Sequence, residues 1–156
     1  MAIEYEGKHV AESSWRFAIV VSRYNASITS NLQKGAVETL SDAGASEQAI
    51  EVFHVPGAWE IPLATRKLAD TGKYDAIVCL GAVIRGETTH DQYINQQVSH
   101  TLGQISQEFQ LPVSFGILTC NSMEQAIHRS GGNVGNKGIE CAQAALEMIH
   151  LLKQIN

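Results

Sequence analysis

A regular alternation of short apolar runs with helical patterns is the feature that most constrains the fold of this chain. The runs are rich in β-branched residues and have the length of buried strands, and they cover residues 17–22, 50–55, 76–84 and 113–118. Apolar residues at helical spacing follow each run, which predicts helices at residues 28–43, 61–71, 91–109 and 122–130, with a last helix at 137–154. Such alternation predicts a parallel sheet with helices on both faces. We therefore expect an α/β three-layer sandwich around a four-stranded parallel sheet.

The length of 156 residues suits one domain with a sizeable core. We assign residues 15–156 to a single α/β domain and residues 1–14 to an N-terminal arm. The arm is polar and has no helical period, and two interpretations remain open for it. It either packs on another surface through Ile3, Tyr5 and Val10, or it is a frayed terminus.

Composition excludes several function classes. The net charge of -5 argues against general binding of nucleic acid, and the low charged share of 17% suggests that copies of the chain cover part of its surface. No apolar run approaches the roughly 20 residues of a membrane span, and no secretory signal pattern is present, so we expect a cytoplasmic protein. Cys79, Cys120 and Cys141 lie in apolar surroundings and are expected to be buried free thiols. No compact cluster of His, Cys and Asp has ligand spacing, so no metal site is expected.

Polar residues follow the predicted strands at the edge where parallel sheets bind ligands. The turn after the third strand runs from Arg85 to His90. Gly86 lacks a Cβ where the chain bends, and Thr88 and Thr89 can cap the next helix, whose free N–H groups suit an anion. His90 can transfer protons near neutral pH, although a structural role for it is equally open.

The other turns supply groups that suit a ligand with a flat ring, hydroxyls and a phosphate. Tyr24 or Phe115 could stack on the ring, Glu60 could accept hydrogen bonds from hydroxyls, and Arg129 could hold the phosphate with the 86–88 amides. Each has a structural alternative. Tyr24 and Phe115 could be aromatic residues of the core or of its rim. Glu60 could be a solvated acid in a first helical turn, and Arg129 could interact with the C-terminus of its helix.

Two phosphate-binding motifs are absent. Residues 131–138 superficially suggest a P-loop, but no glycine precedes Lys137 and Gly138 replaces the Ser or Thr. The spacing of Gly81 and Gly86 is not that of a dinucleotide fingerprint. ATP and NAD are therefore not implied.

Several separate motifs, in order and with matching spacing, resemble the 6,7-dimethyl-8-ribityllumazine synthase family. They lie at residues 55–62, 81–90, 115–119, 124–129 and 135–138. The resemblance extends from about Phe17 to the C-terminus. It implies a flavodoxin-like fold and the penultimate step of riboflavin biosynthesis, without a cofactor or metal. In that step 5-amino-6-(D-ribitylamino)uracil condenses with L-3,4-dihydroxy-2-butanone 4-phosphate to give 6,7-dimethyl-8-ribityllumazine, phosphate and water.

The resemblance also implies residue roles. His90 would be the catalytic proton donor and relay. The ribitylaminouracil would contact Tyr24, Ala58, Trp59, Glu60, Ala82, Val83, Ile84 and, from an adjacent subunit, Phe115. The phosphate would contact Gly86, Glu87, Thr88 and Arg129, with Lys137 and Glu140 as supporting residues. Tyr24 departs from the Phe or Trp usual in the family, and residues 91–97 are less typical of it than their surroundings.

Family membership would further imply a homopentamer. Some members assemble a 60-subunit icosahedral shell, which could associate with riboflavin synthase. A non-catalytic flavin- or lumazine-binding protein, or a shell-forming protein of the same fold, is the alternative. The presence of His90, Arg129 and the 86–88 turn favours the enzyme, because a binding protein needs no proton relay.

Overall fold

The computed structural model describes residues 1–155, and its centre is a parallel sheet of four strands. The strands are β1 (Phe17–Ser22), β2 (Ile50–Val55), β3 (Ala76–Ile84) and β4 (Val113–Cys120), and their order in the sheet is β2-β1-β3-β4. All three pairings are parallel, so every strand ends at the same edge. β1 and the first eight residues of β3 are buried, as expected for the two central strands.

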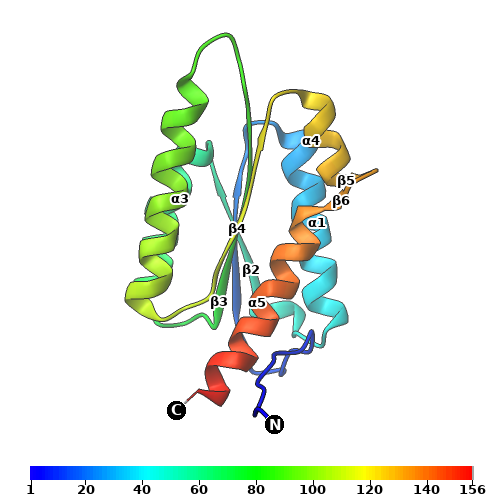
Figure 1. The fold of residues 1–156 in the computed structure, drawn as a ribbon, viewed down its shortest axis with the longest axis vertical. Coiled ribbons are helices and arrows are strands. Elements are labelled where there is room, and N and C mark those ends of the chain that lie inside the picture. Colours follow the sequence, from blue (N-terminus) through cyan, green and yellow to red (C-terminus); the bar gives the residue numbers. More distant parts are fainter. Residues whose placement is uncertain (156) are drawn as a thin grey trace.

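Helices cover both faces of the sheet (Figure 1). On one face, α2 (Ile61–Asp70) and α3 (His90–Phe109) pack against alternate strand residues such as Val20 and Ile77. On the other face lie α1 (Ala26–Asp42), α4 (Met123–Arg129) and α5 (Lys137–Gln154), which contact the intervening residues, including Ile19 and Val78. This arrangement confirms the predicted α/β three-layer fold.

Asn136 joins α5 to α1. Its Oδ1 accepts hydrogen bonds from the Gly138 and Ile139 amides at 2.8 and 3.2 Å, which caps α5, and its Nδ2 donates to Asn31 O at 3.1 Å. A Cβ on Gly138 would lie 2.0 Å from Leu32 O, so only glycine allows this approach of the two helices.

Besides small shifts at other element ends, including two added residues at the end of β4, the elements differ from the sequence prediction in three places. α1 begins at Ala26, two residues early, because Asn25 takes a left-handed conformation and its carbonyl accepts hydrogen bonds from the Ile28 and Thr29 amides. For α4, the spacing of Asn121 and Glu124 in the sequence predicts a capping box that starts at Asn121, but the structure places the cap at Ser122. The Ser122 side chain accepts from the Gln125 amide, and the Gln125 side chain accepts from the Asn121 amide.

The third difference lies in the segment expected to be a loop at residues 131–136. It contributes to an antiparallel pair of short strands, β5 (Ser130–Gly132) and β6 (Gly135–Asn136). Single-turn helices also precede β2 and α2, at η1 (Glu47–Ala49) and η2 (Ala58–Glu60).

The N-terminal arm lies along α5 of its own chain. Gln154 Nε2 donates to Glu6 O at 3.1 Å, and His150 Nε2 lies 2.6 Å from Val10 O. The Ala11 amide donates to Ala43 O at 2.9 Å. Within the described residues, the arm therefore contacts the end of the molecule that holds the last turns of α5 (Figure 1).

The three cysteines are buried and free, as predicted. Burial raises the pKa of the Cys79 thiol to about 12 and that of the Cys141 thiol to about 11. In residues 1–155 no group of three or more His, Cys, Asp or Glu side chains could hold a metal ion. None of the helices described has both the length and the apolar character needed to cross a membrane.

Candidate active site at the carboxyl edge of the sheet

The turn that links β3 to α3 is exposed and opens onto a helix N-terminus. Arg85 continues the pairing with β4 by donating its amide to Cys120 O at 2.8 Å, and the chain then leaves the sheet. Thr88 Oγ1 accepts a hydrogen bond from the His90 amide at 3.3 Å, whereas the Thr89 side chain makes no capping bond. Residues 85–90 are all exposed. The first amides of a 20-residue helix therefore lie beside an exposed turn that contains a glycine, which suits an anion.

The turn after β1 is held between the two neighbouring strands. Its backbone donates to the end of β2, from the Arg23 amide to Val55 O at 2.8 Å and from the Tyr24 amide to Pro56 O at 3.0 Å. On the other side, Asn25 Nδ2 donates to Ala82 O of β3 at 3.0 Å. Tyr24 is left with 65% of its surface exposed at the edge of the sheet.

Asn25 is a positioning residue: the sequence places it in an edge turn but gives it no role. Its backbone has a φ of 63°, in the left-handed region that Asn tolerates better than most residues. An Asn three residues after the end of a buried strand was therefore the available signal.

The turn after β2 adds a buried backbone and an available carboxylate. Gly57 and Ala58 are buried, Trp59 is 54% exposed, and Glu60 is half-buried immediately before α2. The Glu60 carboxylate makes no hydrogen bond or ion pair within residues 1–155, so it is free to accept bonds from a ligand.

Strand order brings these three turns together. β2, β1 and β3 are neighbours and parallel, so their carboxyl ends meet, and the Asn25–Ala82 bond ties two of the turns directly. Ala82 and Val83 are buried at the end of β3, and Ile84 is half-buried. One chain therefore gathers an exposed aromatic ring, a carboxylate, a histidine and a helix N-terminus along one edge.

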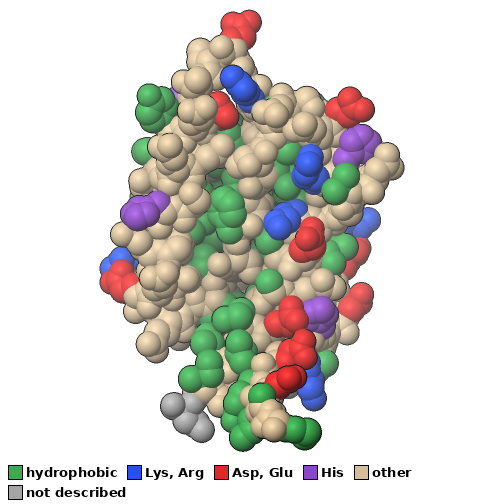
Figure 2. Space-filling view, viewed as in Figure 1, with side chains coloured by type: hydrophobic (Ala, Val, Ile, Leu, Met, Phe, Trp, Pro, Cys, Tyr) green, Lys and Arg blue, Asp and Glu red, His purple; other side chains and the backbone are tan. Residues whose placement is uncertain are grey.

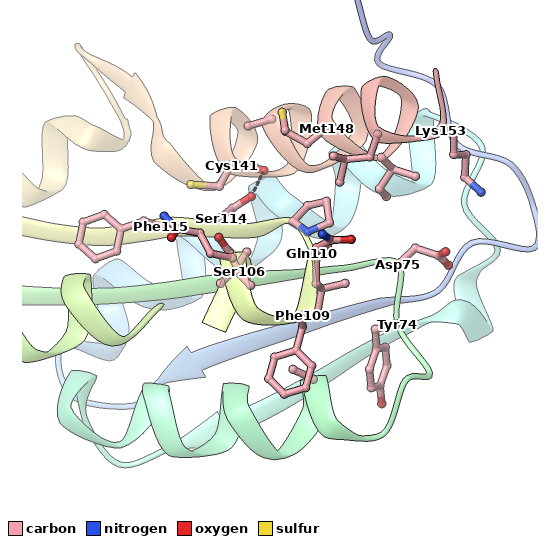
Figure 3. A pocket seen from close by; sticks show the side chains of 18 of the residues that line it. Tyr74, Asp75, Ser106, Phe109, Gln110, Ser114, Phe115, Cys141, Met148 and Lys153 are labelled. Carbon is pink, nitrogen blue, oxygen red and sulfur yellow. Dashed lines mark hydrogen bonds between the residues drawn. The ribbon is translucent and has the colours of Figure 1, made fainter. Parts of the chain in front are cut away.

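Phe115, Lys137 and Glu140 belong to a different place. They line a cavity of about 1170 Å³ beside β4, between the last turn of α3 and α5. Figure 3 shows Phe115 at one end of the row of labelled side chains, and Figure 2 shows hydrophobic side chains along the hollow between the two helical layers. β4 is an edge strand, and Phe115 is 41% exposed on it. Tyr24, Glu60 and His90 are not part of this cavity.

Arg129 lies on the far helical layer from α3. It ends α4, is exposed, and donates Nη1 to Gln125 O of its own helix at 3.3 Å, which is the contact expected of a structural role. Within residues 1–155 no hydrogen bond or ion pair connects Arg129 to the 86–88 turn.

Three guanidinium groups, those of Arg23, Arg85 and Arg129, make no ion pair within residues 1–155. Unpaired guanidinium groups near the edge favour an anionic ligand despite the net charge of -5.

The model of the 6,7-dimethyl-8-ribityllumazine synthase family matches residues 14–153 of the chain. The matched range contains the four strands, the three edge turns, Phe115 and Arg129. Most of the N-terminal arm lies outside it.

Proposed function

This chain belongs to the 6,7-dimethyl-8-ribityllumazine synthase family, an enzyme family of riboflavin biosynthesis, and we propose that it catalyses that synthesis itself. The substrates are 5-amino-6-(D-ribitylamino)uracil and L-3,4-dihydroxy-2-butanone 4-phosphate. The products are 6,7-dimethyl-8-ribityllumazine, phosphate and water. The family match across all three edge turns is the observation that carries this proposal.

The uracil binds where the turns after β1 and β2 meet the end of β3. Tyr24 stacks on the pyrimidine, and backbone groups of residues 82–84 contact the ring. Ala58, Trp59 and Glu60 line the pyrimidine and the ribityl chain, with the Glu60 carboxylate accepting hydrogen bonds from hydroxyls. The exposed Tyr24 ring and the unpaired carboxylate support these roles.

The phosphate of the second substrate binds the turn formed by Gly86, Glu87 and Thr88. Support comes from the exposed amides at the start of α3 and from the absence of a Cβ on Gly86. Arg129 assists through its guanidinium, with Lys137 and Glu140 as supporting residues nearby in the assembled site.

His90 donates and relays protons. The uracil amine attacks the ketone, and loss of water gives an imine. Elimination of phosphate and tautomerisation then produce a new carbonyl group. The ribitylamino nitrogen attacks this carbonyl and a second water leaves, which closes the ring of the lumazine. Each step moves a proton between nitrogen or oxygen and a nearby acid or base. His90 lies in the first turn of α3. It directly follows Thr89, which in turn follows the phosphate-binding residues 86–88. Both reactants are intrinsically reactive, so orientation carries much of the rate enhancement.

A complete site needs two chains. We propose a homopentamer in which a neighbouring copy supplies Phe115 to the edge that holds Tyr24. The separation of Phe115, Lys137 and Glu140 from that edge, and their position beside the open strand β4, support this arrangement. A shell of 60 subunits, associated with riboflavin synthase, is the larger assembly proposed. Light scattering after size exclusion distinguishes pentamer, shell and monomer, and a monomer in solution would contradict the shared site.

The proposed compartment is the cytoplasm, which suits a protein whose three cysteines are free and buried. The decisive experiment mixes the purified protein with both substrates and follows lumazine absorbance and fluorescence together with phosphate release. We expect both signals, and neither when one substrate is omitted. Binding of lumazine without any turnover would instead identify a non-catalytic binding protein.

A further inference from the structure

The backbone conformation at Gly57 does not require a glycine. It is buried between β2 and η2, with a φ of -140° and a ψ of -179°, which is extended backbone that any residue adopts. Conformational freedom therefore gives no reason for a glycine here, and the reason must be space.

The ring of Tyr24 occupies the space that a side chain would need. A Cβ built on Gly57 lies 2.6 Å from Tyr24 Cδ2 and 2.7 Å from Cε2, and the next nearest atom, at 3.7 Å, is Cγ of the same ring. Tyr24 thus packs directly on the Gly57 backbone. No other side chain approaches this position as closely.

The backbone of Tyr24 is already fixed on both sides. Its amide donates to Pro56 O, and the next residue, Asn25, donates its side-chain amide to Ala82 O. Only the side-chain torsions of Tyr24 stay free, and contact with Gly57 restricts them while 65% of the residue remains exposed.

We infer that Gly57 is a positioning residue that sets the orientation of the Tyr24 ring and so determines recognition of the pyrimidine substrate. This inference rests on the proposed function. A methyl group at position 57 cannot share the space with the ring. The Tyr24 ring is exposed and can rotate away from the methyl group, so the protein still folds. The face of the ring that stacks on the pyrimidine is then no longer in the position for stacking.

Steady-state kinetics of Gly57→Ala tests the inference. A lost stacking contact is expected to raise KM for 5-amino-6-(D-ribitylamino)uracil about tenfold, with KM for the butanone phosphate nearly unchanged. Gly103→Ala is the matched control, because a Cβ on that helical glycine meets nothing within 4 Å, and wild-type kinetics are expected. Equal increases in both KM values, or no increase for the uracil, would overturn the assignment.

A double-variant cycle separates positioning from general damage. In a Tyr24→Ala background there is no ring to displace, so adding Gly57→Ala should change nothing further. The same additional loss in both backgrounds would show that Gly57 acts independently of Tyr24. The double variant is also expected to fold, as judged by circular dichroism, and its failure to fold would refute the claim that Tyr24 is the group the methyl meets.

The same double-variant cycle can be measured without turnover, by fluorescence titration of the four proteins with 6,7-dimethyl-8-ribityllumazine. If the wild-type protein binds the lumazine but forms none from the two substrates, the proposed function fails while this titration still tests the Gly57–Tyr24 coupling. A coupling of zero in the titration overturns the inference even if the enzyme is active.

Discussion

Three substitutions of Asn25 separate the two ways in which this residue holds the turn after β1. Its side chain donates a hydrogen bond to Ala82 O at 3.0 Å, and its backbone has a left-handed φ of 63°. The pairing of β1 with β3 ends at Val21 and Leu80. The side-chain amide of Asn25 therefore donates to a carbonyl, that of Ala82, which lies beyond the paired residues of β1.

The structure gives the size of each contribution. Asn25→Gly keeps the backbone conformation but leaves a buried carbonyl unpaired, at a cost of about 1–3 kcal/mol. Asn25→Ala loses the same bond and, unlike Gly, keeps a Cβ in the left-handed region without the polar side chain that makes Asn tolerant there, which costs about 1–2 kcal/mol more than Gly, partly offset by a stiffer unfolded chain. Asn25 makes no side-chain capping bond, so no capping contribution is added. We expect a loss near 3 kcal/mol for Ala and about 1 kcal/mol less for Gly.

Asn25→Asp tests the same bond in the opposite way. It tolerates the left-handed backbone but replaces the donor with a carboxylate oxygen facing a carbonyl oxygen, so it should destabilise more than Gly. Ser30→Ala, at an exposed position of α1, is the control.

Thermal unfolding at one fixed protein concentration measures the series, because association shifts Tm with concentration. A loss of 3 kcal/mol corresponds to about 6–12 °C in Tm for a chain of this length. If Gly were as stable as wild type, the hydrogen bond would contribute nothing. If Ala and Gly were equal, the argument from the left-handed backbone would be wrong.

Three further predictions concern His90, Arg129 and the buried thiols. His90→Asn should lower kcat about 10- to 100-fold without abolishing lumazine formation, because orientation of the substrates remains; unchanged kinetics would remove His90 from the mechanism. Arg129→Ala should raise KM for the butanone phosphate more than KM for the uracil, and equal increases would count against a phosphate role. The raised pKa of Cys79, about 12, means that the folded state holds the thiol proton more tightly than the unfolded state, whose thiol titrates near 9. The contribution of Cys79 to stability in urea should therefore be constant below about pH 9 and be lost as pH rises toward 12, so the decline above pH 9 should be less steep in Cys79→Ala; identical declines for the two proteins would contradict the burial argument.

Much of the fold could be predicted because the central strands β1 and β3 are buried on both faces. β1, β2 and β3 have the predicted bounds, since the apolar residues of each strand end abruptly at a polar turn. β4 is two residues longer than predicted, because Thr119 and Cys120 pair with Val83 and Ile84 at the end of β3. Helix bounds followed from apolar spacing, which marks the packed face but not the cap.

The parts that could not be predicted depend on single contacts between distant segments. The left-handed turn at Asn25 requires the carbonyl of Ala82, 57 residues away in sequence. The β5–β6 pair contains glycines with positive φ, and its sequence lacks the alternation of apolar and polar residues that would predict strands. The family resemblance implied that Phe115 reaches the Tyr24 pocket from an adjacent subunit, but no pattern within the sequence shows by itself that one chain holds the two residues in separate places.

Strand order has a consequence for synthesis of the protein on the ribosome. β1 lies in the middle of the sheet, yet its second neighbour, β3, is made only after β2 and α2. A nascent chain that ends before residue 76 can pair β1 on one side alone, so its most apolar strand keeps one unpaired edge until Ala76 to Leu80 emerge. Chaperones that bind extended apolar segments should therefore engage this chain during a narrow interval of its translation, which closes when β3 pairs with β1.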